Sequence, residues 1–202
     1  MRIRKRLALR LGLVLSLAAA VALFITWTSS ASGGGAQHVR WDIISLTGGA
    51  PPGPINPGGR ASATAPDGDS ITLTGSGTFV APASGGGSGA VTGGGTWSTT
   101  ANGGASGSYT VTGLVSWESA GPQACCPFID NIDEGTRTNG TAVVTIAFSD
   151  GAQGVLTIGC HGPGAPPGIF EGIATTKNYK TYYTVQPPTS GVDANRTIFH
   201  VR

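Results

Sequence analysis

The sequence predicts an all-β protein with antiparallel strands, and three observations lead to this fold class. Aromatic residues recur at strand-like intervals between Phe79 and Phe199, which a disordered Gly-rich chain would lack. Several segments alternate apolar and hydroxyl residues, as half-buried antiparallel strands do. Helical periodicity of Leu and Ala occurs only in residues 1–31. We expect a single barrel of about eight or nine strands, with a two-sheet β-sandwich as the alternative.

Residues 1–31 have the layout of a secretory signal peptide. Five basic residues between Arg2 and Arg10 precede the apolar run of residues 11–27, and the small residues 29–31 follow it. We therefore expect a signal helix that is removed on export, which makes the protein secreted and extracellular. The alternative is an uncleaved segment that anchors the chain, because about 17 to 20 apolar residues approach the length that spans a membrane.

The positive formal charge of the chain belongs to this signal segment. The whole sequence has net charge +2, but beyond residue 31 seven Lys and Arg face ten Asp and Glu, so the remainder carries −3. These seven cations are scattered, without the basic stripe that neutralises nucleic-acid phosphates. Nucleic acid is therefore not an expected partner, and membrane contact is expected only through an uncleaved signal segment.

The rest of the chain divides into residues 32–37, a flexible Gly-rich leader, and residues 38–202, one all-β domain. A domain of this size buries roughly 70% of the surface of its unfolded chain, which is enough for a sizeable core. The first strand is expected over residues 38–46, and the Pro- and Gly-rich residues 48–59 are expected to form a loop.

The next three strands repeat one pattern, in residues 71–79, 91–97 and 107–117. Each has one face of apolar residues and glycines, and another face of Thr and Ser. We expect Trp97 and Tyr109 to lie inside and to pair with each other, and Thr96 and Thr110 to face solvent. Rings covering glycines, and strands bent at glycines, favour a closed barrel.

A hairpin follows a long loop over residues 120–140. Its strands are residues 141–148 and 153–160, and the dipeptide Asp150-Gly151 suits the tight turn between them. After another loop at residues 162–168, three more strands are expected in residues 169–176, 179–185 and 197–201.

Three cysteines in an exported chain leave one thiol unpaired. The predicted hairpin places Thr141 opposite Cys160, so the loop that holds Cys125 and Cys126 returns beside Cys160. We favour a disulfide between Cys126 and Cys160, with Cys125 as the alternative partner. Closing this loop of about 35 residues would stabilise the fold by about 3 to 4 kcal/mol, whereas adjacent cysteines bond only with strain.

No metal and no cofactor are expected. The soft side chains that could bind a metal are Cys125, Cys126, Cys160 and His161. Their spacing is not that of a zinc knuckle, and oxidation of the thiols outside the cell competes with metal binding. A second cluster comprises Asp130, Asp133 and Glu134. Ile132 occupies a ligand position of an EF-hand there, so this cluster is expected to be a solvated acidic loop.

The sequence carries no recognised catalytic motif, so a non-catalytic binding or structural role is favoured over an enzyme. Loops at one end of the barrel would bind an unknown small molecule or carbohydrate through polar and aromatic side chains. The candidate lining residues are Trp41, His161, Glu171, Tyr182 and Arg196.

Two alternative functions stay open. In the first, the barrel is an enzyme for a small apolar substrate, with His161 or Glu171 as the acid or base. In the second, the Thr and Ser face binds an ordered surface, such as ice, or a polysaccharide; sheet twist would make this face uneven.

The chain resembles a group of secreted bacterial Gly/Thr-rich β proteins without an assigned function. The resemblance lies in residues 75–79, 91–97, 109–117, 170–172 and 191–197, and it implies an extracellular location. Residues 71–117 also resemble, more weakly, the strands of dirigent and allene oxide cyclase-type barrels, which carry similar Gly-Gly-Thr-Gly-x-aromatic runs. This second resemblance implies a barrel and assigns no functional residue.

Overall fold

The computed structural model describes residues 35–46, 53–124, 128–188 and 195–202, and this part of the chain is all-β. Its strands are β1 (Gln37–Ser45), β2 (Asn56–Pro57), β3 (Arg60–Thr64), β4 (Ser70–Thr74), β5 (Ser76–Ala81), β6 (Val91–Thr99), β7 (Ser106–Pro122), β8 (Thr136–Phe148), β9 (Gln153–Cys160), β10 (Gly172–Lys177), β11 (Lys180–Tyr182), β12 (Thr184–Val185) and β13 (Arg196–Val201). A single 3-10 turn in the described residues, η1 (Ala101–Gly103), lies between β6 and β7. The predicted signal peptide, residues 1–31, lies outside the described residues. Within those residues, no helix is long and apolar enough to cross a membrane.

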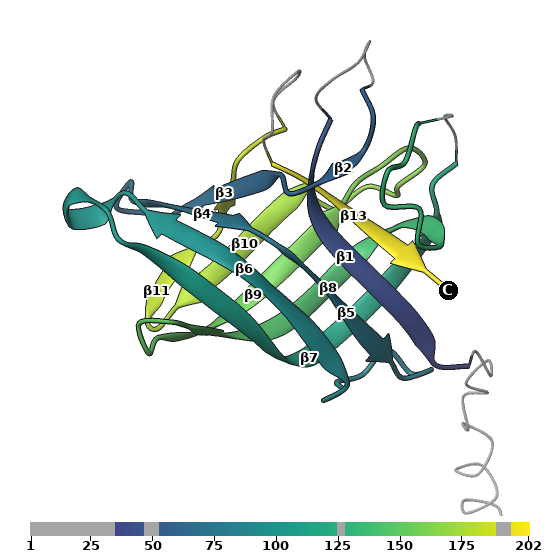
Figure 1. Cartoon of the computed structure of the whole chain (residues 1–202), viewed down its shortest axis with the longest axis horizontal. Coiled ribbons are helices and arrows are strands. Elements are labelled where there is room, and N and C mark those ends of the chain that lie inside the picture. The colour runs from purple at the N-terminus through teal and green to yellow at the C-terminus, as the bar shows by residue number, and fades with distance from the viewer. Residues whose placement is uncertain (1–34, 47–52, 125–127, 189–194) are drawn as a thin grey trace, which may run out of the picture. The chain divides into compact units, whose positions relative to one another are not determined.

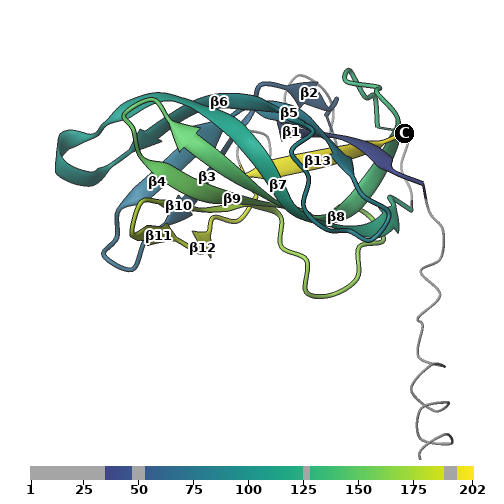
Figure 2. The ribbon, with the colours of Figure 1, turned by 90° about the horizontal axis from the view of Figure 1, so that it is seen from below.

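Six antiparallel strands close into a barrel in the order β8, β13, β1, β5, β6, β7 and back to β8 (Figure 1). The other strands extend from this ring: β9, β10 and β11 continue from β8, while β4, β3 and β12 continue from β6 (Figure 2). The ring is smaller than the expected eight or nine strands because β8 has two partners on one edge. Its residues Thr136 to Thr138 pair with β13, and its residues from Gly140 onward pair with β9.

The predicted strand over residues 71–79 is bent at Gly75 into β4 and β5. Both parts pair with β6, but β4 has β3 on its other side and β5 has β1. Gly75 has φ +136°, and a Cβ at this position would lie 2.7 Å from the Tyr109 hydroxyl. The bend therefore requires a residue without a side chain.

The predicted inner and outer faces are observed. Trp97 and Tyr109 are each 3% exposed, whereas Thr96 and Thr110 face solvent. The register differs from the prediction by two residues, because Trp97 pairs with Gly107 and Tyr109 with Gly95. A shift of two residues leaves every side chain on the same face of the sheet. It also places each of the two aromatic rings opposite a glycine, which has no side chain to collide with the ring.

Strand β7 contains irregularities that change which residues point inward. Its pairing with β8 shifts between Val111 and Gly113 and again between Leu114 and Ser116. As a result Leu114 is buried, whereas Val115, which strict alternation places on the apolar face of residues 107–117, is 47% exposed. Such bulges add a residue to one strand and bend it, which helps a small barrel to curve.

The predicted hairpin is present as β8 and β9, and Gly151 in its turn has φ +88°. Gly140 rather than Thr141 lies opposite Cys160, a shift of one residue. Strands β7 and β8 also extend into the segment expected to be a loop, because β7 ends at Pro122 and β8 begins at Thr136. The segment expected as one strand over residues 179–185 forms β11 and β12 instead.

Aromatic rings fill the barrel interior. Trp117 packs against Phe199 with ring centroids 4.6 Å apart and against Phe79 at 5.7 Å. Trp41 belongs to the same core, where it is 0% exposed and lies opposite Gly77 of β5. The interior is therefore a packed core formed by side chains of the barrel strands.

Residues 128–135 cover the outer face of β1 and β13, so these two strands are buried on both sides. A small apolar cluster lies there, comprising Ile44, Ile55, Ile198, Leu46, Phe128 and Ile132. His200 Nε2 lies 2.8 Å from Asp130 Oδ2, and Glu134 pairs with Arg40 and Arg202. This segment was expected to be a solvated acidic loop. The carboxylates of Asp130 and Glu134 instead bind the barrel, whereas Asp133 is exposed as expected. The described residues hold no cluster of His, Cys, Asp or Glu that could bind a metal.

Candidate binding pocket

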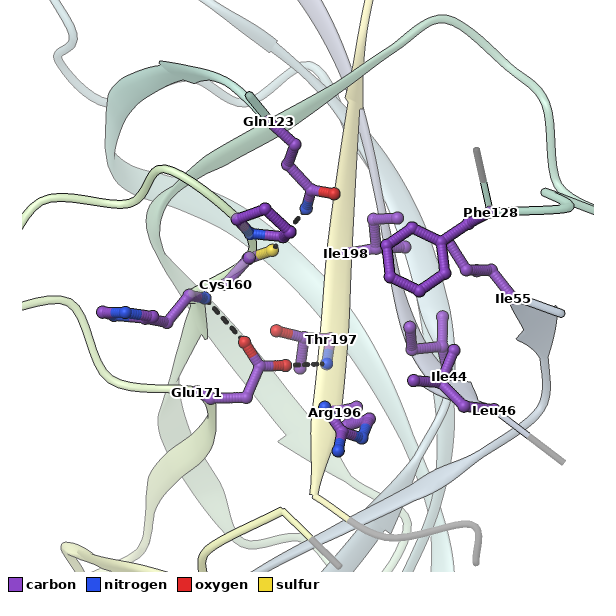
Figure 3. A pocket seen from close by; sticks show the side chains of 13 residues that line it. Ile44, Leu46, Ile55, Gln123, Phe128, Cys160, Glu171, Arg196, Thr197 and Ile198 are labelled. Carbon is purple, nitrogen blue, oxygen red and sulfur yellow. Dashed lines mark hydrogen bonds between the residues drawn. The ribbon is translucent and has the colours of Figure 1, made fainter. Parts of the chain in front are cut away.

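A pocket of about 70 Å³ lies where β9 ends and β13 begins (Figure 3). One wall is apolar and belongs to the cluster beneath residues 128–135, with Ile44, Ile55, Phe128 and Ile198 facing the opening. The other wall is polar and comprises Gln123, Cys160, His161, Glu171, Arg196 and Thr197. A ligand in this pocket would therefore meet apolar side chains on one side and hydrogen-bonding groups on the other.

Glu171 connects the two strands that bound the polar wall. Its Oε2 accepts a hydrogen bond from the His161 backbone N–H at 2.6 Å, and its Oε1 accepts one from the Thr197 N–H at 2.7 Å (Figure 3). Burial raises the pKa of Glu171 to about 7, and the two backbone N–H groups and the positive charge of Arg196 oppose this rise. Because both of its oxygens accept backbone hydrogen bonds, Glu171 links the end of β9 to the start of β13.

His161 is exposed at the rim of the pocket. Its Nδ1 lies 2.8 Å from the Ile169 carbonyl oxygen, while its backbone N–H binds Glu171. The two contacts close the loop of residues 161–171 on itself. The imidazole is therefore held by the loop, beside the pocket opening.

Arg196 supplies the unsatisfied hydrogen-bond donor of the pocket. Its Nε is buried and has no acceptor among the described residues. A buried donor without an acceptor costs free energy, on the order of 1–3 kcal/mol and more for a charged group. An acceptor atom placed in the pocket would remove this cost.

Cys160 is a buried thiol at the back of the pocket. Gln123 Nε2 lies 3.5 Å from its Sγ, and burial raises the pKa of the thiol far above its usual range. A thiol of this kind is a poor nucleophile, because the thiolate is the reactive form. Cys125 and Cys126 lie outside the described residues, so the disulfide between Cys126 and Cys160 stays a prediction.

Three of the five residues predicted to line a binding site meet in this pocket: His161, Glu171 and Arg196. The structure places Trp41 in the barrel core and Tyr182 near the opposite end of β9, where it is buried and donates to Asp69. Sequence reasoning missed Phe128, Ile55 and Gln123. A large aromatic residue within a predicted loop, such as Phe128, was the available signal.

The outer face of the sheet carries ordered hydroxyl groups. One row crosses four strands in register, through Ser62, Thr72, Ser98 and Ser106. Neighbouring hydroxyls also bind each other across strands: Ser62 and Thr72 are 2.8 Å apart, and Thr74 and Thr96 are 2.7 Å apart. These pairs fix the side chains in one orientation.

Comparison of the chain with protein-family models, curated proteins and solved structures gives no match. The protein is therefore classed by its fold alone. It is a six-stranded antiparallel barrel with outer strands, and it has a pocket, apolar on one side, beside the barrel wall. The resemblance to secreted Gly/Thr-rich β proteins and to dirigent-type barrels stays a prediction.

Proposed function

We propose that this protein is a secreted, non-catalytic binding module whose pocket accepts a small molecule with an apolar part and one hydrogen-bond acceptor. The observation that carries this proposal is the buried Arg196 Nε, which lacks an acceptor and lies in the same pocket as the apolar wall of Ile44, Ile55 and Ile198. An acceptor on the ligand would satisfy the arginine, and its apolar part would cover the isoleucines.

The size of the pocket limits what can enter. Its volume of about 70 Å³ is roughly half that of a cavity of about 150 Å³ that binds benzene. A ligand of a few non-hydrogen atoms fits, as does one end of a larger molecule. Because Arg196 is a cation, a carboxylate is the acceptor that binds it most strongly.

The state of the ionisable side chains favours binding over catalysis. Each oxygen of Glu171 accepts a hydrogen bond from a backbone N–H group, which gives this carboxylate a structural role between two strands. The thiol of Cys160 is buried and protonated. Binding also agrees with a barrel interior that is filled by aromatic side chains rather than open to a substrate.

The proposal is tested with isobutyrate, a branched carboxylate, and with isobutanol, which has the same carbon skeleton without the charge. In an NMR titration we expect saturable shifts of the Thr197 and Gly162 amides with isobutyrate, and weaker binding of isobutanol. Arg196→Met keeps the length of the side chain and removes its donors, so it should weaken isobutyrate binding about tenfold or more.

Arg202→Met is the matched control, since it removes a guanidinium that lies just beyond the other end of β13, outside the pocket. It should leave isobutyrate binding unchanged. Absence of saturation with both compounds, or equal affinity of the Arg196→Met variant and the parent protein, contradicts the proposal.

A second candidate function is binding of an ordered surface, favoured by the hydroxyl row that spans β3, β4, β6 and β7. Adjacent strands are about 4.8 Å apart, so the row presents hydroxyls at a regular spacing, although sheet twist limits its flat length. Inhibition of ice recrystallisation measures this function. Ser98→Tyr places a bulky ring within this row and should abolish any inhibition, whereas Thr145→Tyr on β8, outside the row, is its control.

A further inference from the structure

A second hollow, of about 280 Å³, lies at the end of β9 opposite to the pocket. It is formed by η1 and the turn between β10 and β11, at the end of the barrel where β11 is labelled in Figure 1. Asn178 in this turn exchanges two hydrogen bonds with Gln153, the first residue of β9, at 2.7 and 3.1 Å. Since β9 runs from there to Cys160, the two sites are separated by roughly 20 Å of strand.

An exposed tyrosine lies at the mouth of the hollow. Tyr179 is 97% exposed and follows Asn178, whose φ of +53° turns the chain sharply between β10 and β11. The floor is also aromatic, with Trp97 covered by the Lys177 ammonium at 4.4 Å from the ring centroid. The Tyr179 ring is therefore the one aromatic face among these residues that is open to a ligand.

The polar groups of the hollow are held in place by one another. The Asp69 carboxylate accepts hydrogen bonds from the Tyr182 hydroxyl at 2.8 Å and the Thr100 hydroxyl at 2.7 Å, and it pairs with Lys180 at 2.8 Å. Such a network fixes donors and acceptors before a ligand arrives, which lowers the entropic cost of binding.

The charges in and around the hollow nearly cancel. Lys180 pairs with Asp67 and Asp69, and Lys177 pairs with Asp150. Two ammonium groups therefore face three carboxylates, and no cation of this group is left over for an anionic ligand. A neutral ligand rich in hydroxyl groups can both donate to the carboxylates and accept from the ammonium groups.

We propose that this hollow binds one neutral hexose residue of a carbohydrate, with the sugar ring stacked on Tyr179 and its hydroxyls bound by Lys180 and Asn178. The apolar C–H face of a hexose ring matches the open face of a tyrosine, and adjacent ring hydroxyls match a paired ammonium and carboxylate. The volume lies close to the lower end of ligand pockets, about 300 Å³, which suits one sugar ring. This site is separate from the Arg196 pocket and does not depend on it.

The test is an NMR titration of the protein with three neutral probes, the methyl glycosides of glucose, galactose and N-acetylglucosamine. At least one should give saturable shifts of the amides of residues 177–180, with a dissociation constant on the order of millimolar. Methyl glucuronide, which adds a carboxylate, should bind more weakly than methyl glucoside. If none of the three neutral glycosides saturates, or if the glucuronide binds most tightly, the proposal is overturned.

Substitutions locate the binding site. Tyr179→Ala removes only an exposed side chain, so the fold should persist and the affinity for the best glycoside should fall about tenfold. Tyr183→Ala is the matched control, because Tyr183 is 62% exposed but does not line the hollow. Equal loss in both variants, or loss in Arg196→Met instead, would place the sugar elsewhere and overturn the proposal.

Discussion

Tyr109 lies directly opposite Gly95 across the β6–β7 pair, and its hydroxyl donates a hydrogen bond to the Thr74 carbonyl oxygen at 2.9 Å. The Tyr109 side chain of β7 thus extends across Gly95 of β6 and reaches the end of β4, next to the bend at Gly75. A Cβ at Gly95 would lie 1.9 Å from that same Thr74 oxygen. The close approach of β4 to β6 therefore depends on the missing side chain.

Gly95→Ala should destabilise the protein by about 2 to 3 kcal/mol, because the backbone of β4 must move away to admit the methyl group. Urea unfolding followed by tryptophan fluorescence measures the change. Gly89→Ala is the matched control, since nothing lies within 4 Å of a Cβ there, and its midpoint should stay close to that of the parent. A Gly95→Ala variant as stable as Gly89→Ala would show that the strands adjust without cost.

The faces of the strands were predictable from the sequence, whereas their register was not. Alternation with a period of two decides which side chains share a face, and it placed Trp97 and Tyr109 inside. The same alternation is satisfied by any shift of two residues, so it does not distinguish a Trp97–Tyr109 pair from the observed Trp97–Gly107 pair. Bulges break the alternation locally, which is why Val115 points outward.

The polar half of the pocket was also easier to predict than its apolar half. His161, Glu171 and Arg196 lie next to strand ends, where polar side chains gather in any barrel. Ile55 and Phe128 arrive from two separate loop segments, and Ile55 forms an isolated bridge with Asp130 far along the chain. No local pattern encodes a contact between two loops so distant in sequence.

Acid should release the segment of residues 128–135. Burial disfavours the charged Asp130 carboxylate, but hydrogen bonds from His200 and from the backbone of Ile132 and Asp133 outweigh burial and lower its pKa. An acid with a lowered folded-state pKa stabilises the fold above its unfolded value, 3.8, and loses this contribution as the pH falls through the folded-state value. The free energy of unfolding should therefore drop below about pH 4.

Asp130→Asn provides the comparison for this acid effect. At pH 7 the variant should be less stable than the parent by about 1 to 3 kcal/mol, since a neutral amide replaces the charged carboxylate that accepts these hydrogen bonds. At pH 3 the two proteins should converge, because protonation has then weakened the same contact in the parent. A difference that is constant between pH 7 and pH 3 would rule out the ionised Asp130 as its cause.

Glu171 should give the opposite pH dependence. Its pKa is raised from 4.5 to about 7, chiefly by burial, so between these values the unfolded chain loses a proton that the folded protein keeps. An acid with a raised folded-state pKa makes the fold less stable as pH rises through this window, and the loss levels off above the folded-state value. The melting temperature should fall between pH 4.5 and 7, and Glu171→Gln should abolish that slope. A carboxyl carbon resonance of Glu171 that titrates near 4.5 would contradict the raised value.

The thiol of Cys160 should be unreactive in the folded protein, because it is buried and its pKa is raised. If the predicted bridge to Cys126 is present, iodoacetamide should fail to label Cys160 even in denaturant, until a reductant is added. Intact mass should then rise by two hydrogen atoms on reduction. Labelling of Cys160 in denaturant without reductant would refute the bridge and leave burial alone as the source of its protection. Cys126→Ser separates the two cases further: it should lower stability by about 3 to 4 kcal/mol if the bridge exists, and Cys125→Ser should not.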